Sequence, residues 1–258
     1  MVAAEVKVDP GPFALGARSS AYAVLCLHGL TGTPYEVRPL GEAFAAAGLH
    51  AVGPALPGHN ATPADLAAVP SWEAWADAAR SELRELTSRH QKVFVAGLSM
   101  GGLLALLLAS ERLVDAIVVV GVPLRMPGPA PLLVPFLKGF VPFLRKNAGS
   151  DIQDDAARGR HPSYDAMPLH SVHELMKLQR VVRKRLRQVS APILVAHGTL
   201  DRTADPRDAN RIFDGVSSKE RELLFLKESG HVVPVDRDGP ALARAATSFL
   251  LRCAAILR

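Results

Sequence analysis

The strongest chemical signal in the sequence is a serine set between glycines, in the segment GLSMG at positions 97–101. The segment directly follows the apolar run VFVA and precedes the apolar run GLLALLLAS, so it occupies a predicted strand-to-helix turn. Glycines allow such a turn to hold the serine in a strained backbone conformation with its hydroxyl directed outward. The pattern favours Ser99 as a nucleophile and the backbone N–H of Met100 as a donor to an oxyanion. The alternative is a tight glycine-rich turn whose serine has no chemical role.

A serine hydroxyl is a weak nucleophile at neutral pH, so it needs a histidine as base and a carboxylate that orients this histidine. His231 is the candidate base, because it lies between the last predicted strand and the last predicted helix, where ligands of open α/β sheets bind. Asp201, in the segment HGTLD after the predicted strand PILVA, is the candidate acid. Asp205 is the alternative, but the proline that follows it favours a role as a helix N-cap.

Other histidines have less specific interpretations. His28 and His197 each end a predicted strand as His-Gly, which favours a role in ordering a loop. His170 and His173 are three residues apart, but no Cys or carboxylate cluster accompanies them, so we expect solvent-facing side chains and no metal site. The segment HGLTGT after the first long strand places Leu30 near the serine turn, and its backbone N–H is the candidate second oxyanion donor.

These residues need a scaffold that brings several strand ends together, and the sequence predicts one. Short apolar runs bounded by Gly or Pro are typical of parallel strands covered on both faces. They lie at residues 22–27, 50–53, 93–96, 116–120, 193–196 and 223–226. Helical segments alternate with these runs, and this alternation predicts a mostly parallel α/β sheet.

Three of the predicted helices have clear signals. The first is expected to begin at Thr33 and end near Gly48, with Pro34 at its first position and Glu36 completing a capping box. The second begins near Ser71 and carries an apolar stripe that consists of Trp72, Trp75, Ala79, Leu83 and Leu86. The last covers residues 241–257.

One long segment, residues 122–189, interrupts the alternation and is too long for a normal crossover. We predict that it is an inserted cap subdomain, on a core formed by residues 1–121 and 190–258. The first part of the insert contains many prolines, so it cannot form a long regular helix. Phe136 and Phe140 are among its large apolar side chains, and we expect them to contact bound substrate. The alternative is a packing insert without ligand contact.

Length and composition are those of an ordinary single domain, with 258 residues of which 48% are apolar and 21% charged. This excludes disordered chains, collagen-like repeats and disulfide scaffolds. Cys26 and Cys253 lie far apart in apolar contexts, which favours reduced, buried thiols and a cytoplasmic location. The first residues also lack the pattern of a signal peptide. The net charge of +5 does not by itself indicate a nucleic-acid partner, and we expect none.

Positive charge is concentrated in one segment, KLQRVVRKRLR at residues 177–187, which holds six basic and no acidic side chains. Apolar residues recur at helical spacing through it, so the first interpretation is the solvated face of an amphipathic helix. The alternative is a surface that binds a membrane or an anionic ligand.

Taken together, the motifs resemble α/β-hydrolase carboxylesterases of the bacterial monoacylglycerol lipase type and are similar to thermostable bacillus esterases. The resemblance covers about residues 21–249 and is carried by HGLTGTPYEVRPLGEAFAAAG, PGH, SWEAW, VFVAGLSMGG, APILVAHGTLDRTADP and SGHVVPVD. It implies an α/β-hydrolase fold, a triad of Ser99, Asp201 and His231, and oxyanion donors at Leu30 and Met100. The sequence departs from the family pattern at residues 122–191 and at Ala204, where the family usually has a larger aliphatic residue.

These observations predict a serine enzyme that hydrolyses small acyl esters of short to medium chain length through an acyl-enzyme, without a cofactor. We also expect transient contact between the cap and a lipid interface. Alternatives on the same triad are a thioesterase, an acyltransferase or a C–C hydrolase. A non-catalytic small-molecule binding module of the same fold is the alternative of a different class. Nothing in the sequence specifies an oligomeric state.

Overall fold

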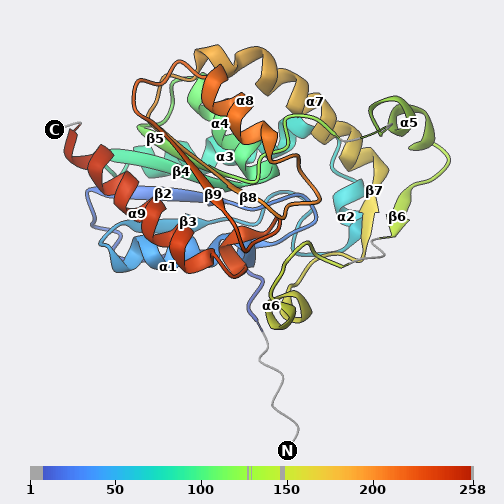
Figure 1. The fold of residues 1–258 in the computed structure, drawn as a ribbon, viewed down its shortest axis with the longest axis horizontal. Helices are drawn as coiled ribbons and strands as arrows, with labels where there is room; N and C mark the ends of the chain where they lie inside the picture. Colours follow the sequence, from blue (N-terminus) through green and yellow to red (C-terminus); the bar gives the residue numbers. More distant parts are fainter. Residues whose placement is uncertain (1–7, 127, 129, 146–148, 257–258) are drawn as a thin grey trace, which may run out of the picture.

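The computed structural model describes residues 8–126, 128, 130–145 and 149–256. Seven strands form one sheet in the order β1-β3-β2-β4-β5-β8-β9 (Figure 1). Their bounds are β1 (Phe13–Leu15), β2 (Tyr22–Leu27), β3 (His50–Gly53), β4 (Lys92–Leu98), β5 (Ala116–Val120), β8 (Ile193–Gly198) and β9 (Arg221–Leu226). Only β1 is antiparallel to its neighbour in this described sheet, so the predicted mostly parallel arrangement is confirmed. The short strand β1 was not predicted, because three residues are too few to show a period.

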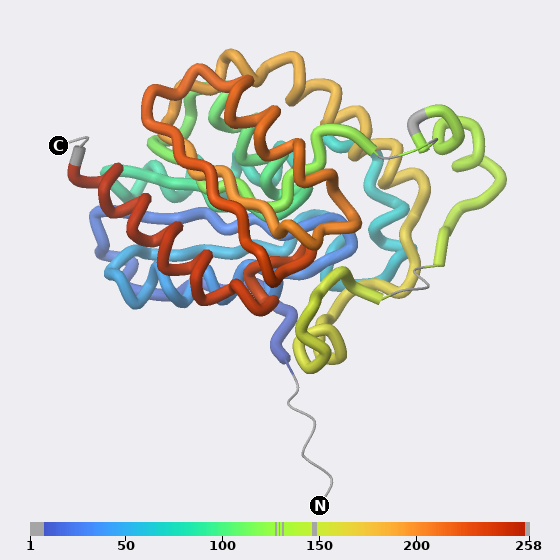
Figure 2. The backbone as a smooth tube through the Cα atoms, in the orientation of Figure 1, coloured from blue at the N-terminus to red at the C-terminus, as the bar shows by residue number. Residues whose placement is uncertain are grey.

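Helices cover both faces of this sheet. One face carries α1 (Arg38–Ala46) and α9 (Gly239–Ile256), which lie side by side in Figure 2 although they come from distant parts of the chain. The other face carries α3 (Trp72–Thr87), α4 (Met100–Ser110) and α8 (Arg207–Gly215). Strand β2 shows the two-sided burial directly, because Leu25 packs into the core on one face and Val24 into the core on the other. This is why the strands have continuous apolar runs.

Helix α4 is buried along its whole length. It lies on the sheet between α3 and the long helix α7 (Leu169–Arg185), which packs over it (Figure 1). This position explains why the sequence of α4 is apolar on every side rather than amphipathic. The helix starts directly after Ser99, so the core holds the predicted nucleophile in place through the helix that follows it.

The first predicted helix differs from expectation at its start. Residues Pro34–Val37 form a 3₁₀ helix, and α1 begins only at Arg38. The Thr33 side chain makes no capping hydrogen bond, so the predicted capping box is wrong. The Glu36 carboxylate instead accepts a hydrogen bond from the Gly29 N–H at 2.8 Å. Because this carboxylate is buried, such a charge-assisted hydrogen bond stabilises it strongly.

The segment at residues 122–189 contains several small elements and one long helix. These are α5 (Ala130–Leu137), β6 (Phe143–Arg145), α6 (Asp155–Arg160), β7 (Ala166–Pro168), α7 and the 3₁₀ turn Leu186–Gln188, while α2 (Pro63–Ala67) packs beside them. Strands β6 and β7 form an antiparallel pair, and α5 projects away from the sheet in Figure 1. In the described residues of the proline-rich part the helix is the short α5, and a long regular helix is absent, as predicted. Because Leu178 and Val182 of α7 belong to the main core, the division into core and cap stays a prediction.

Two further observations concern the whole chain. Cys26 and Cys253 are both buried and unpaired, as predicted. None of the described helices is long and apolar enough to cross a membrane.

Candidate active site

Ser99 lies in the turn between β4 and α4 and has an unusual backbone conformation. Its φ of 55° and ψ of −114° are sterically strained for a residue with a side chain. The Ser99 N–H donates a hydrogen bond to the Val120 carbonyl oxygen at 2.8 Å, which fixes the turn to β5. A side chain at Gly97 would overlap the Gly101 carbonyl, and one at Gly101 would overlap the Leu27 carbonyl. Gly97 and Gly101 are therefore required by this turn, and the predicted strand–turn–helix is present.

Asp201 and His231 form a hydrogen-bonded pair at the carboxyl end of the sheet. Asp201 Oδ2 accepts from His231 Nδ1 at 2.8 Å, and Oδ1 accepts from the backbone N–H groups of Thr203 and Ala204, each at 2.8 Å. Because Nδ1 donates to the carboxylate, Nε2 of the neutral ring carries a lone pair that can accept a proton. The loops after β8 and β9 thus bring together the acid and base predicted from sequence.

Gly121 lies close to the His231 ring and next to the residue that binds the Ser99 backbone. A Cβ added to Gly121 would lie 3.4 Å from His231 Nδ1, and Gly121 directly follows the Val120 carbonyl that binds the Ser99 N–H. The described residues show no hydrogen bond between the Ser99 hydroxyl and His231. Such bonds are often long without substrate and shorten in the complex.

The charges of the pair stabilise one another. Burial alone raises the pKa of Asp201, but the charge of His231 and the hydrogen bonds from His197, His231 and the Ala204 N–H hold that pKa well below its usual range. Burial alone lowers the pKa of His231, but the charge and hydrogen bond of Asp201 outweigh burial and raise it. The carboxylate stays ionised while the imidazole gains basicity, which is the distribution that a general base needs.

Two backbone N–H groups are available beside Ser99. Met100 is the first residue of α4, so its N–H has no acceptor within the helix. This N–H lies at the positive end of the helix dipole. The loop with Leu30 lies against the nucleophile, because a Cβ at Gly29 would be 3.4 Å from Ser99 Cβ. In the described part of the chain neither the Leu30 nor the Met100 N–H has an acceptor. Both N–H groups are therefore available to donate to an oxyanion, which stays a prediction.

The comparisons with known proteins agree with this geometry. Residues 18–238 match the family described as serine aminopeptidase, S33. The chain belongs to the S33 family. It is 32% identical over 236 residues to a thermostable monoacylglycerol lipase of Bacillus sp. strain H-257, covering 92% of this chain and 93% of that protein. It is 23% identical to a carboxylesterase of Bacillus subtilis strain 168, covering 94% of this chain and 97% of that protein.

Solved structures show the same fold. A structure from work on LipS and LipT, two metagenome-derived lipolytic enzymes, has a TM-score of 0.89 and 30% identity, covering 96% of this chain and all of that chain (100%). The monoacylglycerol lipase of Paleococcus ferrophilus has a TM-score of 0.79 at 20% identity, covering 95% of this chain and 100% of that chain. The predicted α/β-hydrolase fold and the family resemblance are confirmed.

The raised pKa of His231 predicts the pH dependence of this S33 protein. His231 must be neutral to accept a proton, so activity is present above its pKa and is lost as the pH falls through it. We expect the acid limb of kcat/KM to have a midpoint above 6.5, the ordinary histidine value. A pH–rate profile with a non-titrating ester tests this. A midpoint below 6.5 in the profile would show that Asp201 does not raise the basicity of His231.

His197 is a site residue whose contact sequence reasoning did not specify. Its Nε2 lies 2.9 Å from Asp201 Oδ2, the same oxygen that binds His231, and the side chain is buried. The predicted role in ordering the loop is consistent with this contact. The signal in the sequence was the spacing, since His197 is the second-last residue of β8 and precedes Asp201 by four residues.

Glu36 connects the loop that carries Leu30 with the segment around α6. Its Oε2 accepts from the Gly29 N–H at 2.8 Å, and its Oε1 lies 3.1 Å from His161 Nε2. His161 Nδ1 in turn lies 2.6 Å from Ser150 Oγ. Burial alone raises the pKa of Glu36, but the hydrogen bond and charge of His161, with smaller effects of His28 and the Gly29 N–H, lower it to about 2. Glu36 is therefore an ionised, buried anchor for the backbone that carries the Leu30 N–H.

We expect Glu36→Ala to lower kcat by up to about 10²-fold with little change in KM, because loss of an oxyanion donor costs about that much and Glu36 positions one. Glu36→Gln should retain most of the native kcat, since its side-chain carbonyl can still accept a hydrogen bond from the Gly29 N–H. Steady-state kinetics of the two variants, at equal folded fraction, check the expectation. If Glu36→Ala lowers only the melting temperature and leaves kcat unchanged, Glu36 has no positioning role.

The remaining predicted residues have other surroundings. Phe136 and Phe140 are 77% and 87% exposed, so their side chains do not enclose the triad in this structure. His170 Nε2 lies 3.0 Å from the Val69 carbonyl oxygen and His173 Nδ1 lies 2.7 Å from Lys138 Nζ, so both are half-buried rather than solvent-facing. Among the described residues, no group of three or more His, Cys, Asp or Glu side chains is arranged to hold a metal ion.

Proposed function

We propose that the protein is a serine carboxylester hydrolase that acts on small acyl esters of short to medium chain length without a cofactor. The observation that carries this proposal is the strained Ser99 at the start of α4, beside a His231–Asp201 pair joined at 2.8 Å. The names of the relatives, monoacylglycerol lipase and carboxylesterase, support the same reaction class.

The mechanism has two steps. Ser99 Oγ attacks the ester carbonyl carbon while His231 Nε2 accepts the hydroxyl proton, and the oxyanion receives hydrogen bonds from the Leu30 and Met100 N–H groups. The C–O bond to the leaving alcohol breaks as His231 returns the proton to that oxygen, leaving an ester on Ser99. Water then attacks this ester, His231 accepts its proton and returns it to Ser99, and the carboxylic acid leaves.

A substrate panel tests the reaction class. We expect nitrophenyl esters and monoacylglycerols to be hydrolysed with kcat/KM well above that for acyl thioesters of equal chain length and for an aminoacyl nitroanilide. Faster turnover of thioesters would favour a thioesterase on the same triad. Transfer of the acyl group to an added alcohol in preference to water would favour an acyltransferase. Absence of turnover on the whole panel would favour the binding-module alternative.

The exposed apolar side chains of α5 and of the turn that follows it provide a surface for the acyl part of a substrate, and we include this contact in the proposal. Phe136 and Phe140 expose large apolar area, as do Leu132 and Leu133 nearby. The same surface supports transient contact with a lipid interface that presents the ester.

We expect the double substitution Phe136→Ala and Phe140→Ala to lower kcat/KM for the longest esters hydrolysed by about three- to tenfold, because apolar contact with the chain is lost. Short esters should be unaffected, and the melting temperature should change little because both side chains are exposed. Leu251→Ala, an exposed apolar residue on α9, is the matched control. If the chain-length profile is unchanged, acyl specificity resides elsewhere.

A further inference from the structure

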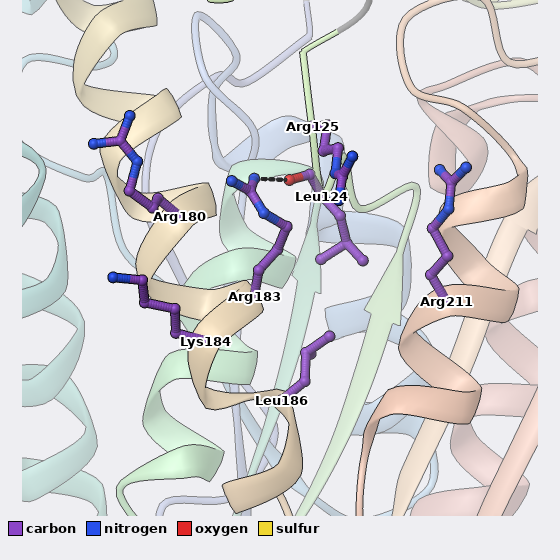
Figure 3. Close-up of a pocket in the computed structure, with 7 residues that line it drawn as sticks. All are labelled: Leu124, Arg125, Arg180, Arg183, Lys184, Leu186 and Arg211. Atoms are coloured by element: carbon purple, nitrogen blue, oxygen red, sulfur yellow. Dashed lines mark hydrogen bonds between the residues drawn. The ribbon is translucent and has the colours of Figure 1, made fainter.

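A basic pocket lies outside the candidate active site, between α7, α8 and the segment that follows β5 (Figure 3). Its volume is about 430 Å³. Seven residues line it, namely Leu124, Arg125, Arg180, Arg183, Lys184, Leu186 and Arg211, of which five are Arg or Lys. None of the triad or oxyanion residues is among them.

Three separate parts of the chain supply the cations. Arg180, Arg183 and Lys184 lie on one face of α7, because residues three and four apart in a helix are neighbours. Arg125 comes from the loop after β5, and Arg211 comes from α8. Figure 3 shows Arg125, Arg183 and Arg211 extending toward the same end of the pocket from these three elements. Arg180 and Lys184 also line the pocket, but their head groups extend to the other side of α7 in this view. Arg125, Arg183 and Arg211 are therefore the cations that gather around the cavity.

Most of this charge is uncompensated. Arg211 pairs with Asp208 at 2.6 Å and Asp205 at 3.3 Å. Arg125, Arg180, Arg183 and Lys184 form no ion pair with any described residue. In contrast, two other cations of the same helix, Lys177 and Arg185, pair with Glu174 and Glu111.

Arg183 is the central member of the group and is half-buried. Its Nη1 donates to the Leu124 carbonyl oxygen at 2.5 Å, which directs the guanidinium into the pocket (Figure 3). Burial and then the charges of Arg125 and Arg180 lower the pKa of Arg183, and the charge of Asp208 offsets only part of this effect. Like charges held this close repel one another, and a bound anion relieves that repulsion.

We propose that this pocket binds a phosphate-bearing anion, with a diphosphate group as the best match for its charge. Guanidinium groups bind phosphate oxygens through two parallel N–H donors, and Arg is favoured where such planar recognition matters. Four unpaired cations exceed what a single carboxylate neutralises. The apolar side chains of Leu124 and Leu186 also line the pocket, so an apolar part of the ligand can contact them.

The Arg125 side of the pocket lies near the carboxyl end of β5, where the Val120 carbonyl oxygen accepts the Ser99 N–H. Arg125 follows Gly121 by four residues, so their Cα atoms are at most about 14 Å apart, given about 3.6 Å per extended residue. Gly121 is the residue against which the His231 ring lies. The proposal concerns binding only and does not depend on the reaction that Ser99 performs.

Isothermal titration with inorganic pyrophosphate at fixed ionic strength tests the proposal. We expect the native protein to bind, and the double variant Arg180→Gln/Lys184→Gln to bind at least tenfold more weakly. Both side chains are exposed, so this variant should fold. The matched control is Arg187→Gln/Lys227→Gln, which removes the same charge from exposed residues outside the pocket and should change the Kd less than twofold.

A second variant and a vesicle-binding experiment complete the test. Arg125→Gln, at an exposed loop residue, replaces the double variant if that variant fails to fold by circular dichroism. Flotation with phosphatidylglycerol vesicles distinguishes a lipid headgroup from a soluble phosphate. Vesicle binding that pyrophosphate displaces and the pocket variant abolishes identifies a headgroup, and pyrophosphate binding without flotation identifies a soluble ligand. The proposal is overturned if the native protein binds neither probe, or if the control variant loses as much affinity as the pocket variant.

Discussion

Replacing Ser99 by alanine is expected to lower kcat for ester hydrolysis by about four orders of magnitude or more, as loss of the nucleophile does in other serine triads. The reason is that no other group at the start of α4 can form the acyl-enzyme. The fold should remain intact, because the turn is fixed by the Ser99 backbone N–H and by the glycines around it rather than by the hydroxyl.

Steady-state kinetics and thermal unfolding of Ser99→Ala are the measurements. Ser110→Ala is a matched control, since Ser110 lies at the other end of α4 and its hydroxyl only caps the Leu107 carbonyl. Ester turnover by Ser99→Ala above a few per cent of the native rate would remove Ser99 from the mechanism.

Replacing Asp201 by asparagine is expected to lower kcat by about 10⁴-fold. The amide can donate to His231 Nδ1 and so favours the tautomer in which Nε2 carries the proton and cannot act as a base. His197 shares the same Asp201 oxygen, so the substitution also disturbs the residue that helps to orient the carboxylate. Kinetics measured at a pH above the His231 pKa separate this loss of kcat from a change in the protonation of His231.

Asp205→Asn is the discriminating control. The N-cap of α8 is Pro206 rather than Asp205, which differs from the sequence prediction, and the Asp205 carboxylate accepts the Arg207 backbone N–H at 3.0 Å from one residue further out. Asparagine can still accept this N–H, and only the exposed ion pairs with Arg207 and Arg211 are lost, so we expect stability to change by at most about 0.5 kcal/mol and kcat to stay nearly unchanged. If Asp205→Asn is inactive and Asp201→Asn is active, the assignment of the acid is wrong.

The sequence predicted most of the scaffold, because the relevant signals are local. Buried parallel strands have apolar runs bounded by Gly or Pro, and six such runs correspond to observed strands with ends that agree within about two residues. The serine turn could also be predicted from the sequence, since Gly97 and Gly101 are needed for local steric reasons. Asp201 and His231 followed from their positions after strands whose carboxyl ends meet.

Other features depend on contacts between distant residues and could not be derived from local patterns. Glu36 has the spacing of a capping box, but its carboxylate instead contacts His161, which lies 125 residues away in the sequence. The basic segment on α7 has the pattern of a solvated helix face, but Arg125 and Arg211 complete a pocket that no single segment contains. The exposure of Phe136 and Phe140 depends on how α5 is held, which proline content alone does not specify.

The most direct test of the central claim, that His231 and Asp201 activate Ser99 as a nucleophile, is labelling with a fluorophosphonate followed by peptide mass spectrometry. This reagent modifies serines whose hydroxyl is activated by a neighbouring base. We predict a single adduct on the peptide that contains Ser99, lost in Ser99→Ala and formed much more slowly in His231→Ala. No adduct on the folded native protein, or an adduct on a different serine, would contradict the account.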